Sequence, residues 1–183
     1  MKVFIAFAGP RLKGNTAQLL ESFVSGMKSA RADIDFVDGK VYQKKINYCR
    51  GCEACKTKTG VCVQHDEMFD MYDDIYSSDV LVMAAPTYWF NMSGQLKVFL
   101  DRLYGMKAGG MRNKTLVYIT TYGDVDEYAS GAHNAINSIK EISEYLGVPY
   151  EAVYASTGMG SVSKAALEKA FRQGEEVAKS IKK

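Results

Sequence analysis

Val3-Phe4-Ile5-Ala6-Phe7-Ala8, followed at once by Gly9-Pro10-Arg11-Leu12-Lys13-Gly14-Asn15-Thr16, is the stretch that decides the fold. Its first six residues are all apolar, which is typical of a strand buried on both faces of a parallel sheet. A short turn with glycine and proline ends this strand. The residues beyond it carry apolar side chains at helical spacing, namely Leu20, Phe23, Val24 and Met27. The stretch therefore predicts a strand, a turn and a helix.

The same alternation of strand and helix patterns continues along the chain. Further strands are predicted at 34–37, 80–85, 115–121 and 150–155. Helical periodicity marks Gly94–Gly105, Glu127–Leu146 and the residues from Val162 to the end. Gly174 interrupts the last helix at a cost of about 1 kcal/mol relative to Ala. The alternation predicts the α/β class, with a parallel sheet that has helices on both faces and the short, polar second strand at an edge.

Length and charge exclude several classes of protein. The chain of 183 residues is predicted to form a single domain, 1–183, because no linker or repeat divides it. A net charge of +2, with the Lys and Arg residues scattered, gives no case for a nucleic acid or a membrane surface as partner. No stretch approaches the roughly 18 consecutive apolar residues of a membrane span, so we expect a soluble, cytoplasmic protein.

The turn after the first strand is a candidate phosphate site. Such turns present free backbone N–H groups at the positive end of a helix dipole. The turn lacks both the Gly-Lys-Ser/Thr ending of a P-loop and the G-x-G-x-x-G of a dinucleotide fold. An ordinary turn with Asn15 as the helix N-cap is the alternative. The candidate ligands are Gly9, Pro10, Arg11, Gly14, Asn15 and Thr16.

Two more loops are predicted at the same edge of the sheet, where open α/β sheets hold their ligands. The loop after the third strand contains three consecutive aromatic residues, which could flank a flat ring. A hydrophobic plug or a subunit contact is the alternative, above all for Phe90 and Met92. The fourth strand ends in hydroxyl groups and another aromatic ring. The candidate ligands in these two loops are Pro86, Thr87, Tyr88, Trp89, Asn91, Thr121, Tyr122, Gly123 and Asp124.

These motifs resemble those of the NADPH-dependent FMN reductase family of flavodoxin-like proteins. The resemblance covers nearly the whole chain and rests on Ala8-Gly9-Pro10-Arg11, Asn15-Thr16, Pro86-Thr87-Tyr88-Trp89 and Lys97-Val98-Phe99-Leu100-Asp101-Arg102. It implies a three-layer sandwich around a five-stranded sheet of order 2-1-3-4-5. It also implies FMN, with its phosphate in the first loop and its ring against the other two. Gly9 departs from the family, which often has Ser there, and this removes one hydroxyl donor.

All four cysteines lie in one polar segment, about residues 39–64, that interrupts the alternation and is longer than most connections. Cys49, Cys52, Cys55 and Cys62 form the pattern C-x2-C-x2-C-x6-C. Structural zinc usually uses two separate ligand pairs, so this compact spacing favours a [4Fe-4S] cluster over zinc. The nearby His65 keeps zinc open as an alternative, and free thiols in a mobile lid or interface loop are another.

An FMN-binding fold with this cysteine segment resembles the iron-sulfur flavoproteins of anaerobic archaea and bacteria. The resemblance implies one [4Fe-4S] cluster on the four cysteines, one FMN per subunit, assembly into homodimers or homotetramers, and electron exchange with ferredoxin. We therefore expect an FMN-dependent oxidoreductase that passes electrons from ferredoxin or NAD(P)H to a small-molecule acceptor. No catalytic acid or base is predicted. The alternatives are a cluster-free NAD(P)H-dependent FMN or quinone reductase, a flavodoxin-like electron carrier, and a zinc-stabilised binding module.

Overall fold

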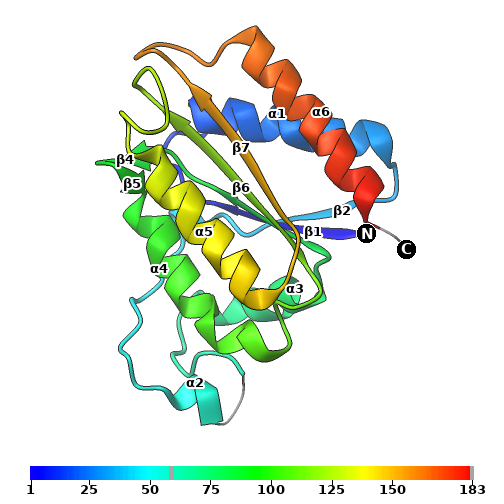
Figure 1. Cartoon of the computed structure of the whole chain (residues 1–183). Coiled ribbons are helices and arrows are strands. Elements are labelled where there is room, and N and C mark those ends of the chain that lie inside the picture. Colours follow the sequence, from blue (N-terminus) through cyan, green and yellow to red (C-terminus); the bar gives the residue numbers. More distant parts are fainter. Residues whose placement is uncertain (58–59, 182–183) are drawn as a thin grey trace.

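Five parallel strands form the central sheet of the protein, whose computed structural model describes residues 1–57 and 60–181 (Figure 1). In the order β2-β1-β3-β6-β7 they are β2 (Asp35–Asp38), β1 (Lys2–Phe7), β3 (Val80–Ala84), β6 (Thr115–Tyr122) and β7 (Tyr150–Ser156). Strands β4 (Thr87–Tyr88) and β5 (Asn91–Met92) form a separate hairpin. If the five strands of the main sheet are numbered along the chain without β4 and β5, their order in the sheet is 2-1-3-4-5. The predicted sheet is confirmed, and the strand bounds differ from the prediction by one residue at most.

Successive residues of β1 serve two different hydrophobic cores, because neighbouring side chains of a strand point to opposite faces of the sheet. Val3 lies in one core with Phe23, whereas Phe4 lies in the other core with Phe99. Strands β1, β3 and β6 are buried along nearly their whole length, and the edge strand β2 is not. The continuous apolar runs in the sequence therefore correspond to strands buried on both faces.

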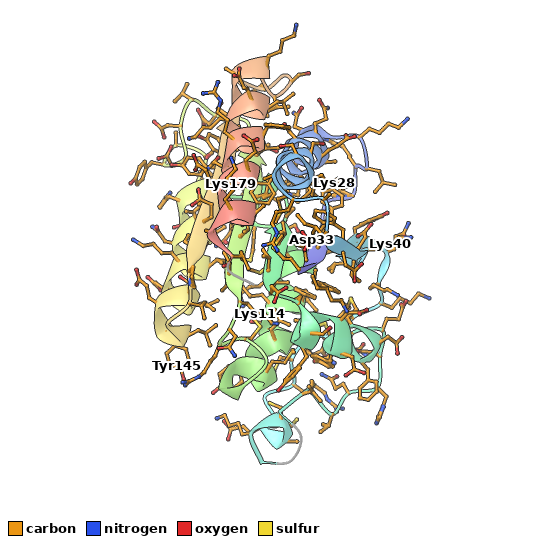
Figure 2. The ribbon with its side chains drawn as sticks, turned by 90° about the vertical axis from the view of Figure 1, so that its right-hand side faces the viewer. Lys28, Asp33, Lys40, Lys114, Tyr145 and Lys179 are labelled. Atoms are coloured by element: carbon orange, nitrogen blue, oxygen red, sulfur yellow. The ribbon has the colours of Figure 1, made fainter. Side chains whose placement is uncertain are left out.

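Helices cover both faces of the sheet, which gives the predicted three layers (Figure 1). One face carries α1 (Asn15–Ala30) and α6 (Lys164–Ser180), and the other carries α3 (Tyr72–Ser77), α4 (Gly94–Arg102) and α5 (Ala132–Leu146). Lys28 and Lys179 mark α1 and α6 in Figure 2, where the two helices lie side by side. The helix α3 is absent from the sequence prediction because six residues are too few to show a periodic pattern.

Helices α1 and α6 touch backbone to backbone. A β-carbon on Gly26 would collide with the carbonyl group of Phe171, and one on Gly174 would collide with that of Phe23. Gly174, which interrupts the helical pattern in the sequence, is therefore a packing residue. The close approach of the two helices offsets the helix propensity that a glycine loses, about 1 kcal/mol relative to Ala.

The predicted start of the helix at Glu127 is wrong, and backbone geometry explains why. Helix α5 begins at Ala132, because Gly131 takes a left-handed conformation with φ 72° as its N-cap. Turns occupy the preceding residues. The predicted end is correct, since Gly147 is left-handed (φ 68°) directly after Leu146.

The predicted helix Gly94–Gly105 changes its geometry before it ends. Helix α4 stops at Arg102, and the chain continues as the 3-10 helix η3 (Leu103–Ala108). Its apolar stripe is nevertheless buried as predicted.

In the polar segment between β2 and β3, the described residues form short elements: the 3-10 helices η1 (Val41–Gln43) and η2 (Phe69–Met71), and the helix α2 (Ala54–Thr57), besides α3. Figure 1 shows α2 standing out from the body of the molecule beyond α4. Residues 58–59 of the cysteine segment, and 182–183 of the last predicted helix, lie outside the described residues.

No helix in the described part of the chain has the length and apolarity that a membrane crossing requires.

Candidate functional site

A small pocket opens at the carboxyl edge of the sheet, where the three predicted loops meet. Its volume is about 80 Å³. The lining residues are Phe7, Gly9, Pro10, Arg11, Gly14, Asn15, Thr16, Pro86, Tyr88 and Thr121. All of them except Phe7 are candidate residues from the sequence. The structure thus brings all six candidate residues of the first loop together with one or two residues from each of the other loops.

Helix α1 begins at this pocket. Its N-cap is Gly14, which adds no side-chain bond, so the N–H groups of the first turn have no capping side chain. Asn15 instead ties the pocket to the loop after β7, because its Nδ2 donates to Gly160 O at 2.8 Å and its Oδ1 accepts from Val162 N at 3.1 Å. The exposed Arg11 adds a positive charge. Free N–H groups, a helix dipole and a cation are together typical of an anion site.

Two threonine pairs fasten the three loops to one another. Oγ1 of Thr16 lies 2.6 Å from Oγ1 of Thr121, and Oγ1 of Thr87 lies 3.0 Å from Oγ1 of Thr120. Thr120 and Thr121 are neighbours in β6, so their side chains point to opposite faces of the sheet. The end of β6 therefore holds the first loop on one face and the second loop on the other.

Gly9 has no room for a side chain. A β-carbon there would lie 2.8 Å from Cζ of Phe7 and 3.3 Å from Cδ of Pro86. The ring of Phe7 is in turn held edge-on against Tyr42, with the ring centroids 5.6 Å apart. The departure from Ser at this position is thus matched by the packing, because the Phe7 ring occupies the space of the missing side chain.

The aromatic loop is the hairpin of β4 and β5, with Trp89 and Phe90 at its tip. Both residues have positive φ, 45° and 65°, as in a type I′ turn, where Asn and Gly are usual. Trp89 is 94% exposed, and its ring centroid lies 6.3 Å from that of Phe90. Left-handed geometry costs such residues about 1–2 kcal/mol each. Strain of this kind gathers at functional sites.

The hairpin is anchored at its tip and just after β5 by residues that the sequence analysis missed. Nδ2 of Asn134 donates to Phe90 O at 3.0 Å, and a β-carbon on Gly131 would lie 2.5 Å from Cα of Phe90. Ser93 caps α4, and its hydroxyl donates to Ala8 O at 3.1 Å. A serine directly before an apolar stripe is an N-cap signal that could have identified Ser93. No local pattern identifies Gly131 or Asn134.

The other candidate residues do not line the pocket: Thr87, Trp89, Asn91, Tyr122, Gly123 and Asp124. Tyr122 is buried, and burial together with the nearby acidic residues raises the pKa of its hydroxyl to about 12. That hydroxyl is therefore protonated at neutral pH. The carboxylate of Asp124 accepts from Val125 N at 2.8 Å, which shapes the loop after β6.

In the cysteine segment, a residue with left-handed geometry lies between each cysteine and the next. These residues are Gly51, Glu53 and Gly60, with φ of 64°, 57° and 67°. Such residues change the direction of the backbone locally. All four cysteines are free thiols. Gly105 gives the segment room, since a β-carbon there would lie 2.9 Å from that of Cys55.

The four thiols are close enough to influence one another. Burial raises the pKa of the Cys55 thiol, and the other three cysteines raise it further. Burial also acts to raise the pKa of Cys62, but the hydrogen bonds of Gln64 and the charge of Arg102 outweigh it and lower the pKa. Across residues 1–57 and 60–181, no three Cys, His, Asp or Glu side chains are grouped closely enough to hold one metal ion.

Two features near the cysteines do not extend the site. His65 packs against Phe69, with ring centroids 5.0 Å apart. A larger hollow of about 540 Å³ lies between α4 and α5 and reaches Cys49, with mainly apolar walls that include Leu100 and Ile142. It shares no lining residue with the pocket at the sheet edge.

Comparison with known proteins agrees with this geometry. Residues 1–160 match the family model of NADPH-dependent FMN reductase. An iron-sulfur flavoprotein of Archaeoglobus fulgidus is 29% identical over 185 residues, which cover 99% of this chain and 80% of that protein. An iron-sulfur flavoprotein of Methanocaldococcus jannaschii is 28% identical over 186 residues, covering 100% and 92%.

Among solved structures, an FMN-dependent NADH-azoreductase of Bacillus anthracis in complex with FMN matches with a TM-score of 0.68 at 17% identity, over 97% of each chain. This likeness confirms the flavodoxin-like fold. The family match of residues 1–160 includes the pocket at the sheet edge, the aromatic hairpin and the cysteine segment. The chain is a flavin-dependent oxidoreductase and belongs to the NADPH-dependent FMN reductase family.

Proposed function

We propose that this oxidoreductase binds FMN at the sheet-edge pocket, with the phosphate at the start of α1 and the isoalloxazine ring against the loops after β3 and β6. The observation that carries the proposal is the convergence of Arg11, Thr16 and the uncapped start of α1 on one pocket. Its volume of about 80 Å³ is far below the roughly 300–1,000 Å³ of sites that enclose a whole ligand. A phosphate group therefore suits the pocket, and the ring lies outside it.

Aromatic residues beside the pocket suit the ring. Tyr88 lines the pocket and is 42% exposed, and the more exposed Trp89 follows it at the hairpin tip. Bound FMN supplies transfer of a hydride or of single electrons. In this proposal Arg11 and the start of α1 bind the phosphate, the threonine pairs fix the loops, and the hairpin orients the ring.

The position of Trp89 provides the test, because it is the only tryptophan of the chain. We expect FMN to quench its fluorescence on titration into the flavin-free protein. Arg11→Ala weakens binding about tenfold, as the loss of a charged hydrogen bond does. The matched control is Arg112→Ala, which leaves affinity unchanged. Arg112 is an exposed arginine just before the start of β6, at the opposite edge of the sheet. Equal affinities for all three proteins contradict the phosphate position.

The four cysteines hold a [4Fe-4S] cluster in this proposal. Four free thiols are the required donor set, and Nε2 of Gln64 lies 3.7 Å from Sγ of Cys62, as a stabilising donor. Ligands of a cluster bind different iron atoms and stand farther apart than ligands of one ion. The observations agree with this: the thiols act on one another electrostatically, yet in the described residues they are not grouped closely enough to bind one ion. Two archaeal relatives carry the name iron-sulfur flavoprotein. A bound cluster supplies one-electron transfer.

Ferredoxin or NAD(P)H is the proposed electron donor, and a small molecule is the acceptor. A site with both FMN and a cluster suits exchange between one-electron and two-electron carriers, and the family description names NADPH. We place a homodimer or homotetramer in the same proposal, because the exposed aromatic hairpin tip offers apolar area for a subunit contact.

Metal and flavin analysis of one anaerobically purified sample tests the cofactors together. About four irons and four sulfides per chain, alongside FMN, support the cluster. FMN without iron leaves a cluster-free FMN or quinone reductase. Zinc in place of iron favours a structural metal on the cysteines. A chain that binds no flavin contradicts the proposed function.

A further inference from the structure

Arg102 is a buried charge between the flavin-binding fold and the cysteine segment. It is the last residue of α4, and its side chain is 0% exposed, which is rare for an arginine. Its guanidinium makes a two-point ion pair with Asp66, with Nη1 2.6 Å from Oδ2 and Nη2 3.0 Å from Oδ1. A pair so far from water depends on further hydrogen bonds to offset its desolvation.

Those further bonds reach both ends of the cysteine segment. Just before the first cysteine, Nη1 donates to Asn47 O at 2.7 Å. Just after the last cysteine, Nη2 donates to Gln64 O at 3.4 Å. Asp66 also accepts from Asn47 N at 2.9 Å. One ion pair therefore fastens both ends of the loop that carries the four thiols.

One donor of the guanidinium remains without a partner. The bonds above use Nη1 and Nη2, whereas the Nε of Arg102 is buried and makes no hydrogen bond to the described part of the chain. A buried donor of this kind requires an explanation. The unpaired Nε belongs to the same buried junction that holds Asn47 and Gln64, so the guanidinium lies where the two ends of the cysteine segment meet α4.

We infer that Arg102 is a positioning residue for the cysteine segment: together with Asp66 it fixes both ends of the segment, at Asn47 and Gln64, to the end of α4. The inference rests on the proposed role of the cysteines as cluster ligands. Groups that hold and orient the ligands of a metal site contribute strongly to its affinity. Arg102 therefore favours uptake of the cluster by fixing the ends of the loop that carries the ligands.

Three variants test whether Arg102 fixes the cysteine segment. Arg102→Lys keeps the charge but cannot make all the hydrogen bonds of a guanidinium. The double variant Asp66→Asn/Arg102→Gln removes the ion pair without leaving a lone buried charge, so it can fold where Arg102→Gln alone leaves Asp66 unpaired. Arg172→Gln is the matched control, since Arg172 is an exposed arginine on α6 that pairs with Glu168.

The first measurement is amide hydrogen exchange in the iron-free protein, which depends on neither cluster nor flavin. We expect exchange at residues 45–48 and 64–66 to be about tenfold faster or more in the double variant, intermediate in Arg102→Lys and unchanged in Arg172→Gln. The sheet peptides serve as an internal control. Unchanged exchange in the segment overturns the inference.

The second measurement is the iron content of the reconstituted proteins. We expect the least iron in the double variant, more in Arg102→Lys and the wild-type amount in Arg172→Gln. Equal iron content in all four proteins overturns the role of Arg102 in holding the ligands, even if exchange has changed. A wild-type chain that takes up no iron contradicts the cluster, whereas the exchange result still decides whether Arg102 fixes the segment.

Discussion

Gly26 of α1 and Gly174 of α6 face each other across a helix crossing in which each glycine lies against the backbone of the other helix. We expect Gly174→Ala to lower the free energy of unfolding by about 1–3 kcal/mol, because the new methyl group forces the helices apart. Helix propensity alone predicts a gain of about 1 kcal/mol. Urea unfolding measures the sign. Gly94→Ala, at a helical position with no atom within 4 Å of the added carbon, is the control and is tolerated.

Restoring the hydroxyl at the first loop does not improve the site. We expect Gly9→Ser to lower both stability and FMN affinity, because its β-carbon would press on Phe7 and Pro86. The double variant Phe7→Leu/Gly9→Ser makes room and recovers part of the affinity. Trp89 fluorescence titration measures both. Tighter FMN binding by the single variant would show that Phe7 yields easily and that the missing hydroxyl matters.

We expect the strained hairpin tip to lower the free energy of unfolding while supporting FMN binding. Phe90→Gly relieves a positive φ and increases the free energy of unfolding by about 1 kcal/mol. It also weakens FMN binding, because Trp89 loses its ring neighbour. Lys40 also has left-handed geometry (φ 46°) but does not line the pocket, so Lys40→Gly is the control. We expect it to raise stability without changing FMN binding. Unchanged FMN binding by Phe90→Gly would show that the strained hairpin tip does not contribute to FMN binding.

Lys114 gives the protein a pH dependence in the alkaline range. Its ammonium donates to Tyr76 O and Ser78 O beside the start of β6 (Figure 2), and burial lowers its pKa from 10.5 to about 8, against the opposing charge of Asp79. Between these two values the unfolded chain binds more protons than the folded one. Stability from this group therefore rises with pH across that window.

Lys114→Met tests the effect. We expect the variant to be less stable throughout, because two carbonyl groups lose their donor. Its deficit relative to wild type grows from pH 8 to pH 10, since only wild type gains stability there through this lysine. Chemical unfolding at several pH values measures the difference, which cancels the titration of the tyrosines. A constant deficit would mean that Lys114 stays protonated in the fold.

The sequence predicts the sheet and the first loop because their signals are local. The run ending at Ala8 and the turn up to Thr16 contain the strand, the turn and the helix start in one stretch. The hairpin β4–β5 is missed because Trp89 and Phe90 stand where a two-residue turn usually has Asn and Gly. Its anchor Asn134 comes from another helix, and no pattern in one sequence reports such a contact.

Arg102 shows a different limit. It lies three residues after Phe99, on the edge of the apolar stripe of α4, and a charge at such a position indicates burial with a partner. Its partner Asp66 and the two carbonyl groups lie in an irregular segment, so the network depends on the tertiary fold. The cysteine spacing predicts that the four thiols gather at one site, and both that site and its occupancy by a cluster stay predictions.

The packing of α1 against α6 also makes the pocket depend on a helix that follows every strand in the chain. Until α6 folds, part of the apolar face that it shares with α1 stays uncovered. The loop that Asn15 binds, at Gly160 and Val162, lies just before α6. A chain in which α6 has not yet folded therefore leaves this loop without its support and one wall of the pocket unclosed.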